Sequence, residues 1–404
     1  MSRAGRGAAV VAGALIALAA CTRDSPIGDG TTTPSASIPA APVVTDGPSP
    51  PIPVGPPDGH PLHPLDRDAG VSARLRDGSM IWFFGDTGQF DGAGRLVSFE
   101  IGTAAWAPAA TPTATADFDD GFGRPVAFAT PTPSFPTCPP EAPSAGMWPL
   151  SAIVVPDGEV DRVVVWMLNI CLGSATYGAT MGTSVGEWVY DPHAPRDGAI
   201  EVTVLNQLLF EASPGGRAAF GTAAVLTDGL AYVYTCGIPE RAISLDDYGP
   251  CHVARVEPSK VADPDAYEMW TGVTWEPNGD PAPLLLDEHG GQQTPPVGPF
   301  SVGWDESSEQ FVMVYSPWPA YSPNVEIRVA NRPEGPWSAP AFIELPGCAD
   351  RVGPEMRTCY GANVQPSFNA AGRLGIGYQD QLVADSPRRG SFLLTTVGVD
   401  LTAG

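Results

Sequence analysis

The sequence predicts an all-β fold, a five-bladed β-propeller with four-stranded antiparallel blades. The main observation is a hairpin signal, a short polar turn between two apolar runs, which recurs around positions 77, 157, 228, 305 and 369. No long stretch of the chain has the 3.6-residue apolar period of a helix. Gly and Pro, with 46 each among 404 residues, are present at about twice their usual share, which also disfavours long helices.

The first hairpin shows the pattern most clearly. An apolar run that starts at Val71 leads to the turn Asp77-Gly78 and then to an aromatic and β-branched strand that ends at Phe84. The five turns are 64 to 80 residues apart, whereas compact blades have about 40 to 50 residues. Each unit therefore has room for a second hairpin, which we expect within residues 95–106, 187–209, 252–275, 325–343 and 391–401. A pair of β-sandwiches is the alternative, but it does not explain five units of the same order.

The N-terminal segment predicts export and anchoring. Arg3 and Arg6 precede an apolar run of 13 residues, 8–20, which is shorter than the run of about 20 residues that spans a membrane. The sequence Leu-Ala-Ala-Cys at 18–21 resembles a bacterial lipobox, so we expect a signal peptide over 1–20 and acylation of Cys21. An ordinary signal peptide with an incidental Cys is the alternative. Either interpretation places the protein outside the cytoplasm, and the first anchors it to the cell membrane by lipid.

The next segment predicts a linker. Residues 22–60 contain ten Pro and five Gly and show no apolar period, so we interpret 21–61 as the acylated Cys followed by a disordered tether. Residues 62–404 then form a single propeller. A Pro- and Thr-rich stretch at 107–145 interrupts the hairpin order, and we expect this inserted loop to line one side of the channel.

Cysteine and charge content limit the partners. An even number of cysteines after Cys21 in an exported chain predicts disulfides. Six cysteines allow about 15 pairings, and short separations favour two of them, which leaves one further pair. No CxxC spacing or other metal or cofactor motif occurs, so we expect no metal and no cofactor. The net charge of −24 disfavours nucleic acid, and we expect a monomer. The favoured pairs are Cys236 with Cys251, Cys348 with Cys359, and Cys138 with Cys171.

Two carboxylates are the candidate catalytic groups. Asp68 precedes the first strand of the first hairpin and Asp86 ends its return strand, so the hairpin brings both to the same end of the sheet. Hydrolysis of a glycosidic bond requires one carboxyl group to protonate the leaving oxygen and another to activate water or attack. Turn capping is the structural alternative for both residues. First-strand entrances and one polar loop supply candidate sugar contacts: Trp148, Phe220, Gln293, Tyr360 and Asn363.

These motifs resemble a known family. The pattern D-x-G-x-S at 68–72, followed by D-G-x-x-I-W-x-F-G-D-T at 77–87, is similar to the first blade of the actinobacterial endo-D-arabinanase family, formerly a domain of unknown function. The resemblance implies a five-bladed propeller that cleaves internal D-arabinofuranosyl linkages of arabinogalactan or lipoarabinomannan, with catalytic Asp residues that match Asp68 and Asp86. The 107–145 insertion and the cysteines depart from the family pattern. Weaker similarity occurs at 148–151, 220–221, 232–234, 254–256, 270–275, 335–338 and 360–366.

The resulting prediction is a glycoside hydrolase that acts on cell-wall arabinan. We expect Asp68 to be the base and Asp86 the acid. The opposite ends of a hairpin leave room for water between carboxyl groups about 6.5 to 9.5 Å apart, which favours inversion at the anomeric carbon. The alternatives are a hydrolase of another furanose polymer, such as L-arabinan or fructan, and a non-catalytic polysaccharide-binding lipoprotein.

Overall fold

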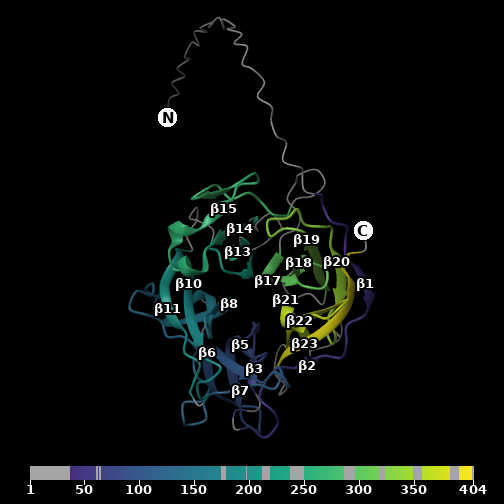
Figure 1. The fold of residues 1–404 in the computed structure, drawn as a ribbon. Coiled ribbons are helices and arrows are strands. Elements are labelled where there is room, and N and C mark those ends of the chain that lie inside the picture. The colour runs from purple at the N-terminus through teal and green to yellow at the C-terminus, as the bar shows by residue number, and fades with distance from the viewer. Residues whose placement is uncertain are drawn as a thin grey trace, which may run out of the picture. The chain divides into compact units, whose positions relative to one another are not determined.

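Five antiparallel sheets make up the computed structural model, each formed mainly by consecutive strands (Figure 1). The structure describes residues 37–60, 62, 65–173, 179–196, 198–211, 219–236, 250–285, 296–317, 324–348, 357–382 and 391–402. Within these residues, the only helical elements are short 3-10 turns. The predicted all-β five-bladed propeller is confirmed.

Each sheet forms one blade. Blade 1 contains β3 (Leu65–Arg67), β4 (Val71–Arg74), β5 (Met80–Phe90), β6 (Leu96–Ala107) and β7 (Ala116–Asp117). Blade 2 contains β8 (Ser144–Asp157), β9 (Val160–Leu172), β10 (Ala179–Tyr190) and β11 (Thr203–Glu211). Blade 3 contains β12 (Ala223–Thr227), β13 (Leu230–Cys236), β14 (Cys251–Val256), β15 (Glu268–Trp270) and β16 (Trp275–Pro277). Blade 4 contains β17 (Pro296–Asp305), β18 (Gln310–Pro317), β19 (Asn324–Ala330) and β20 (Ala341–Glu344). Blade 5 contains β21 (Arg357–Val364), β22 (Arg373–Leu382), β23 (Ser391–Asp400), β1 (Val43–Asp46) and β2 (Ile52–Pro53), and the 3-10 turns are η2 (Pro258–Lys260), η3 (Pro264–Ala266) and η4 (Pro366–Phe368).

The predicted hairpin turns connect the first two strands of the blades. In blade 1, Asp77 Oδ1 accepts a hydrogen bond of 3.0 Å from the Ser79 backbone N–H. Gly78 in the same turn has φ +81°, a conformation that side chains with a Cβ rarely adopt. The turns at Asp157 and Asp228 join β8 to β9 and β12 to β13 in the same way. The Asp-Gly signal therefore located these hairpins correctly.

The core lies between the blades, with one hydrophobic cluster at each of the five blade interfaces. Successive residues of β5 point to opposite faces of the sheet. Ile81 and Phe83 pack toward blade 2, whereas Trp82 and Phe84 pack toward blade 5. Each of these side chains is fully buried, and burial of one such side chain contributes about 1.5 to 3 kcal/mol. The blades are thus held together by apolar packing on both faces.

The N-terminal segment completes blade 5, which corrects the predicted boundary at residue 62. β1 pairs with β23 through Val43 opposite Asp400, and β2 pairs with β23 through Ile52 opposite Leu394. Arg373 Nη1 of β22 also lies 3.0 Å from Asp46 Oδ2 of β1. An edge strand joins a sheet through backbone hydrogen bonds, so a Pro-rich segment without apolar period can still form one. The predicted signal peptide and Cys21 lie outside the described residues.

The 107–145 insertion mainly builds the outer part of blade 1. β7 is the strand of this sheet farthest from the channel, and Asp117 on it forms a buried ion pair with Arg67 at 2.5 Å. Phe128 is buried in the cluster between blades 1 and 2, where its backbone N–H donates to Gly102 O at 3.1 Å. The expectation that the insertion lines the channel therefore fails for β7, because the outer edge of blade 1 uses it as a strand.

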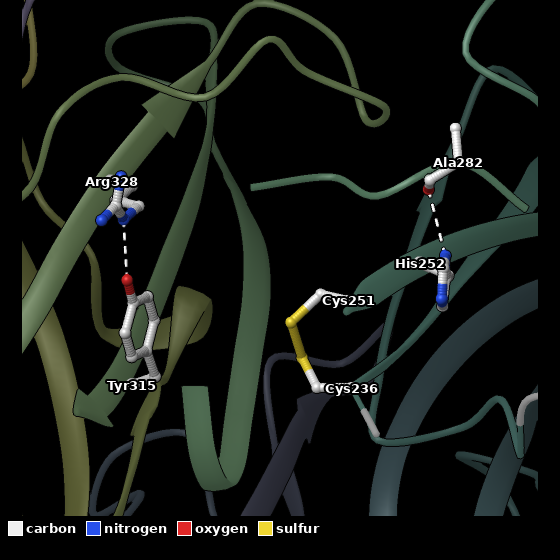
Figure 2. Close-up of a disulfide and its surroundings, with 6 residues drawn as sticks. All are labelled: Cys236, Cys251, His252, Ala282, Tyr315 and Arg328. Carbon is white, nitrogen blue, oxygen red and sulfur yellow. Dashed lines mark hydrogen bonds between the residues drawn. A yellow bond between two sulfur atoms is a disulfide. The ribbon is translucent and has the colours of Figure 1, made fainter. Parts of the chain in front are cut away.

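The three predicted disulfides are present, Cys138–Cys171, Cys236–Cys251 and Cys348–Cys359. Figure 2 shows the second of them joining opposite residues of β13 and β14, beside the 3.1 Å hydrogen bond between His252 Nδ1 and Ala282 O. Three disulfides indicate an extracytoplasmic location, since thiols are kept reduced in the cytosol. Among the residues that the structure describes, no helix is long and apolar enough to cross a membrane.

Candidate active site

Asp68 and Asp86 lie directly opposite each other where β3 pairs with β5. The Arg67–Thr87 pair precedes them in the register, and the Asp68 backbone N–H donates to Asp86 O at 3.2 Å. The Asp68 side chain turns toward the neighbouring strand, where its Oδ1 accepts a hydrogen bond of 2.8 Å from the Asp86 backbone N–H. The predicted pairing of two carboxylates at one end of the hairpin is therefore what the geometry shows.

A glycine makes room for this arrangement. A Cβ at Gly85 would lie 2.1 Å from Asp68 Oδ1, so any other residue at this position would displace the carboxyl group. The Gly85 backbone N–H also donates to Asp68 O at 2.8 Å. Gly85 is part of the sequence motif, but spacing alone gave no reason to assign it a role.

The second oxygen of Asp68 faces blade 5. Tyr360 on β21 donates a hydrogen bond from its hydroxyl group to Asp68 Oδ2 at 2.9 Å. Burial raises the pKa of Asp68 to about 6, although the hydrogen bonds from Tyr360 and from the Asp86 backbone lower it. Asp68 therefore has one donor on each oxygen, and both donors favour its ionised form.

Asp86 faces blade 2 and has fewer donors. Trp148 Nε1 on β8 donates to Asp86 Oδ1 at 2.6 Å, and no described residue donates a hydrogen bond to Asp86 Oδ2. Burial raises the pKa of Asp86 to about 7, and the charge of Asp68 raises it further. Asp86 is thus the carboxyl group that keeps its proton to the higher pH.

The two carboxyl groups differ in the way that acid–base catalysis needs. Close to pH 6 to 7, a single proton is shared by a pair whose protons are released in two coupled steps. Asp86 holds that proton preferentially, because Asp68 has the additional donor. This arrangement can protonate one oxygen of a ligand while it accepts a proton from water.

Only some of the other predicted site residues lie at the carboxyl pair. Trp148 and Tyr360 are half-buried and hold the carboxyl groups in place. Phe220 is 1% exposed and packs edge-on against Phe210, so its ring lies in the core and not at the mouth of the channel. This corrects its predicted place, because an aromatic ring at the start of a first strand can also fill the blade interface. Gln293 lies outside the described residues.

Asn363 is buried and connects blade 5 to blade 1. Its side-chain amide donates to Gly70 O at 3.0 Å and to Gly361 O at 3.2 Å. Gln365, which sequence reasoning did not single out, adds a hydrogen bond of 3.1 Å to Gly70 O, and Ser72 Oγ donates to Gln365 Oε1 at 2.5 Å. Nothing in the spacing of these polar residues showed that they meet across two blades.

Metal-binding groups and cavities are the other kinds of candidate site that the described residues could form. No group of three or more His, Cys, Asp or Glu side chains is placed to hold a metal ion in these residues. A cavity of about 220 Å³ lies at the other end of blade 5, where it is lined by Asp305, Arg373 and Asp400 among others. None of its lining residues contacts the Asp68–Asp86 pair.

The fold is a five-bladed β-propeller, and solved structures that resemble it include a glycoside hydrolase. The chain belongs to the DUF4185 family, described as a domain of unknown function, whose model matches residues 173–377, just over half of the sequence. No curated protein matches the chain.

Solved structures share the propeller fold at low sequence identity. A "putative hydrolase" from Bacteroides ovatus has a TM-score of 0.57 and 14% identity, over 82% of this chain and 85% of its own. A protein named as a glycoside hydrolase has a TM-score of 0.50 and 10% identity, over 87% and 92%. A GH43_1 enzyme from Xanthomonas citri has a TM-score of 0.46 and 14% identity, over 85% and 89%. Similarity at this level concerns the fold alone.

Proposed function

We propose that this protein is a glycoside hydrolase that cleaves internal D-arabinofuranosyl linkages of cell-wall arabinogalactan or lipoarabinomannan. The observation that carries the proposal is the opposed pair Asp68 and Asp86, two half-buried carboxyl groups with raised pKa values at one end of blade 1. The D-arabinan substrate follows from the resemblance of residues 68–87 to the endo-D-arabinanase family.

In the proposed mechanism, Asp86 is the general acid and Asp68 the general base. Asp86 gives its proton to the glycosidic oxygen as the bond to the anomeric carbon breaks. Asp68 takes a proton from the water molecule that attacks the same carbon from the opposite face, so the pair ends with the proton on the other carboxyl group.

We also propose inversion at the anomeric carbon. The carboxyl groups turn toward different blades, Asp68 toward Tyr360 and Asp86 toward Trp148, and they form no hydrogen bond with each other. This divergence favours a water molecule between them over direct attack by one carboxylate. The anomer that forms first, read by NMR during hydrolysis, tests this point.

The location that we propose suits a polysaccharide of the cell envelope. Acylation of Cys21 would hold the protein at the outer face of the cell membrane, and the three disulfides agree with export. The proposed partners are therefore arabinan and, through the lipid, the membrane.

The experiment is incubation of the mature protein with purified arabinogalactan, with new reducing ends as the readout. We expect Asp68→Asn and Asp86→Asn each to lower turnover by a factor on the order of 10² to 10⁴. Asp119→Asn is the matched control, because Asp119 is an exposed loop residue of blade 1. Cleavage of only L-arabinan or fructan would correct the substrate, and retention on arabinan without new ends would favour a binding protein.

A further inference from the structure

Asn363 connects the two backbone segments that carry the base and its hydrogen-bond donor. The side chain is 6% exposed, and its amide nitrogen donates to Gly70 O at 3.0 Å and to Gly361 O at 3.2 Å. Gly70 lies two residues after Asp68 in blade 1, and Gly361 directly follows Tyr360 in blade 5. The amide group of Asn363 thus connects the two segments that form the Tyr360–Asp68 hydrogen bond.

The segment that carries Tyr360 is irregular at the point where Asn363 binds it. Tyr360 pairs with Gln379 and Asn363 pairs with Gly377, so β21 contains one extra residue between these pairs. Gly361 has φ +67° within this bulge. Bulges occur beside active sites, where they change the direction of a side chain. The hydrogen bond of 3.2 Å from Asn363 to the Gly361 carbonyl group lies within this bulge, next to Tyr360.

The space around the amide is tightly restricted. A Cβ at Gly377 would lie 2.8 Å from Asn363 Oδ1, so the opposite strand approaches the amide closely. Gln365 Nε2 donates to the same Gly70 carbonyl group at 3.1 Å. The backbone that follows the base therefore receives two amide donors from blade 5.

We propose that Asn363 is the positioning residue of the catalytic base, and that it acts by setting the hydrogen bond from Tyr360 to Asp68. This inference rests on the proposed function, in which Asp68 is the base. Without Asn363, Gln365 still donates to Gly70 O, but the bond to Gly361 O in the bulge is lost. The bulge then no longer holds Tyr360 against Asp68, whose remaining donor is the Asp86 backbone N–H. Besides Tyr360 on β21, the titratable groups of the described residues that face Asp68 are Asp66 on β3 and Asp86 on β5.

Loss of the Tyr360 hydrogen bond should shift the pKa of Asp68 in one direction. Loss of a donor to a carboxylate favours its protonated form, so the pKa of Asp68 rises. One hydrogen bond to a charged group changes such an equilibrium by about tenfold, which corresponds to about one pKa unit. Because the base must be ionised, the acid limb of the pH profile of kcat/KM moves to higher pH, while the alkaline limb stays.

The test compares Asn363→Ala and Tyr360→Phe with Asn169→Ala. Asn169 is also fully buried and its amide also donates to a backbone carbonyl group, Gln207 O at 2.6 Å, but it lies on β9 of blade 2, opposite Met147, and has no hydrogen bond to Asp68, Tyr360 or Gly70. The readout is the pKa of Asp68, measured by carbon-13 NMR titration of its carboxyl group, together with the pH profile. We expect the first two variants to raise this pKa by about one unit and the control to lower only the melting temperature.

Two results would overturn the inference. One is an unchanged pKa of Asp68 in Tyr360→Phe. The other is an Asn363→Ala protein that melts earlier, as the Asn169→Ala control does, but keeps the wild-type pKa. If Asn363→Ala does not fold, Asn363→Ser, whose hydroxyl group can donate only one of the two bonds, replaces it with the same pair of outcomes. The titration needs no turnover, so a wild-type protein that does not cleave arabinan contradicts the proposed function and leaves the titration to decide this inference.

Discussion

At the scale of single residues, the difference between Asp68 and Asp86 predicts the pH dependence of activity. The pKa of Asp68 is raised to about 6 and that of Asp86 to about 7, in both cases mainly by burial. Below the lower value the base is protonated, and above the higher value the acid has lost its proton. We therefore expect a bell-shaped profile of kcat/KM with its maximum between them. A plateau that extends beyond pH 9 in initial-rate measurements on arabinan would rule out Asp86 as the acid.

The burial that raises the pKa of Asp86 also predicts that its ionised form destabilises the folded protein. Because the pKa of Asp86 is higher in the folded than in the unfolded protein, its contribution to stability is present below about pH 4 and is lost as the pH rises through about 7. Asp86→Asn removes the buried charge, so this variant should melt a few degrees higher than the wild type at pH 8. At pH 4 the two should melt together. Differential scanning calorimetry at both pH values checks this, with Asp119→Asn as a control that should show no such difference.

At the scale of strands and hairpins, the N-terminal strands are predicted to stabilise blade 5. Ser49 N donates to Thr396 O at 2.8 Å and Val54 N to Phe392 O at 2.9 Å, in addition to the pairing of β1 and β2 with β23. Each such bond contributes about 1 kcal/mol net. A chain that starts at residue 62 should therefore melt about 5 °C or more below a chain that starts at residue 37. Equal melting temperatures would show that these strands add nothing to the fold.

The elements also show what a sequence can and cannot predict here. The hairpin at Asp77 and the pairing of Asp68 with Asp86 were predictable, because turn chemistry and strand register act locally. The bond from Trp148 to Asp86 was not, since it spans 62 residues and depends on how blade 2 packs against blade 1. The place of Phe220 was predicted wrongly for the same reason. β1 was not predicted, because a strand at the edge of a sheet pairs through its backbone and needs no alternation of apolar residues.

At the scale of the whole molecule, polar groups on the innermost strands connect neighbouring blades around the channel. Ser151 Oγ donates to Gly221 O at 2.7 Å between blades 2 and 3, and the Val364 N–H donates to Ser301 Oγ at 2.5 Å between blades 4 and 5. The bridge from Asn363 to Gly70 does the same between blades 5 and 1. These bonds fix the distance between blades, on which the approach of Trp148 and Tyr360 to the carboxyl groups depends.

The described part of the N-terminal segment joins the propeller in blade 5, beside the C-terminal strand β23. β23 runs from Ser391, which pairs with Asp380 near the level of Tyr360, to Asp400, which pairs with Val43 of β1. The chain therefore enters the propeller at the end opposite to the Asp68–Asp86 pair.

This predicts that loss of the anchor changes location and not catalysis. Cys21→Ala removes the acylated thiol, so the protein should move from the membrane fraction to the soluble extracytoplasmic fraction. Cys21 lies upstream of every described strand. The kcat/KM of the Cys21→Ala protein on dissolved arabinan should therefore equal that of the wild type. Fractionation followed by a high-salt wash makes the measurement, since salt removes a protein that is held by charge alone. A Cys21→Ala protein that stays with the membrane after the wash would show that the lipobox interpretation of residues 18–21 is wrong.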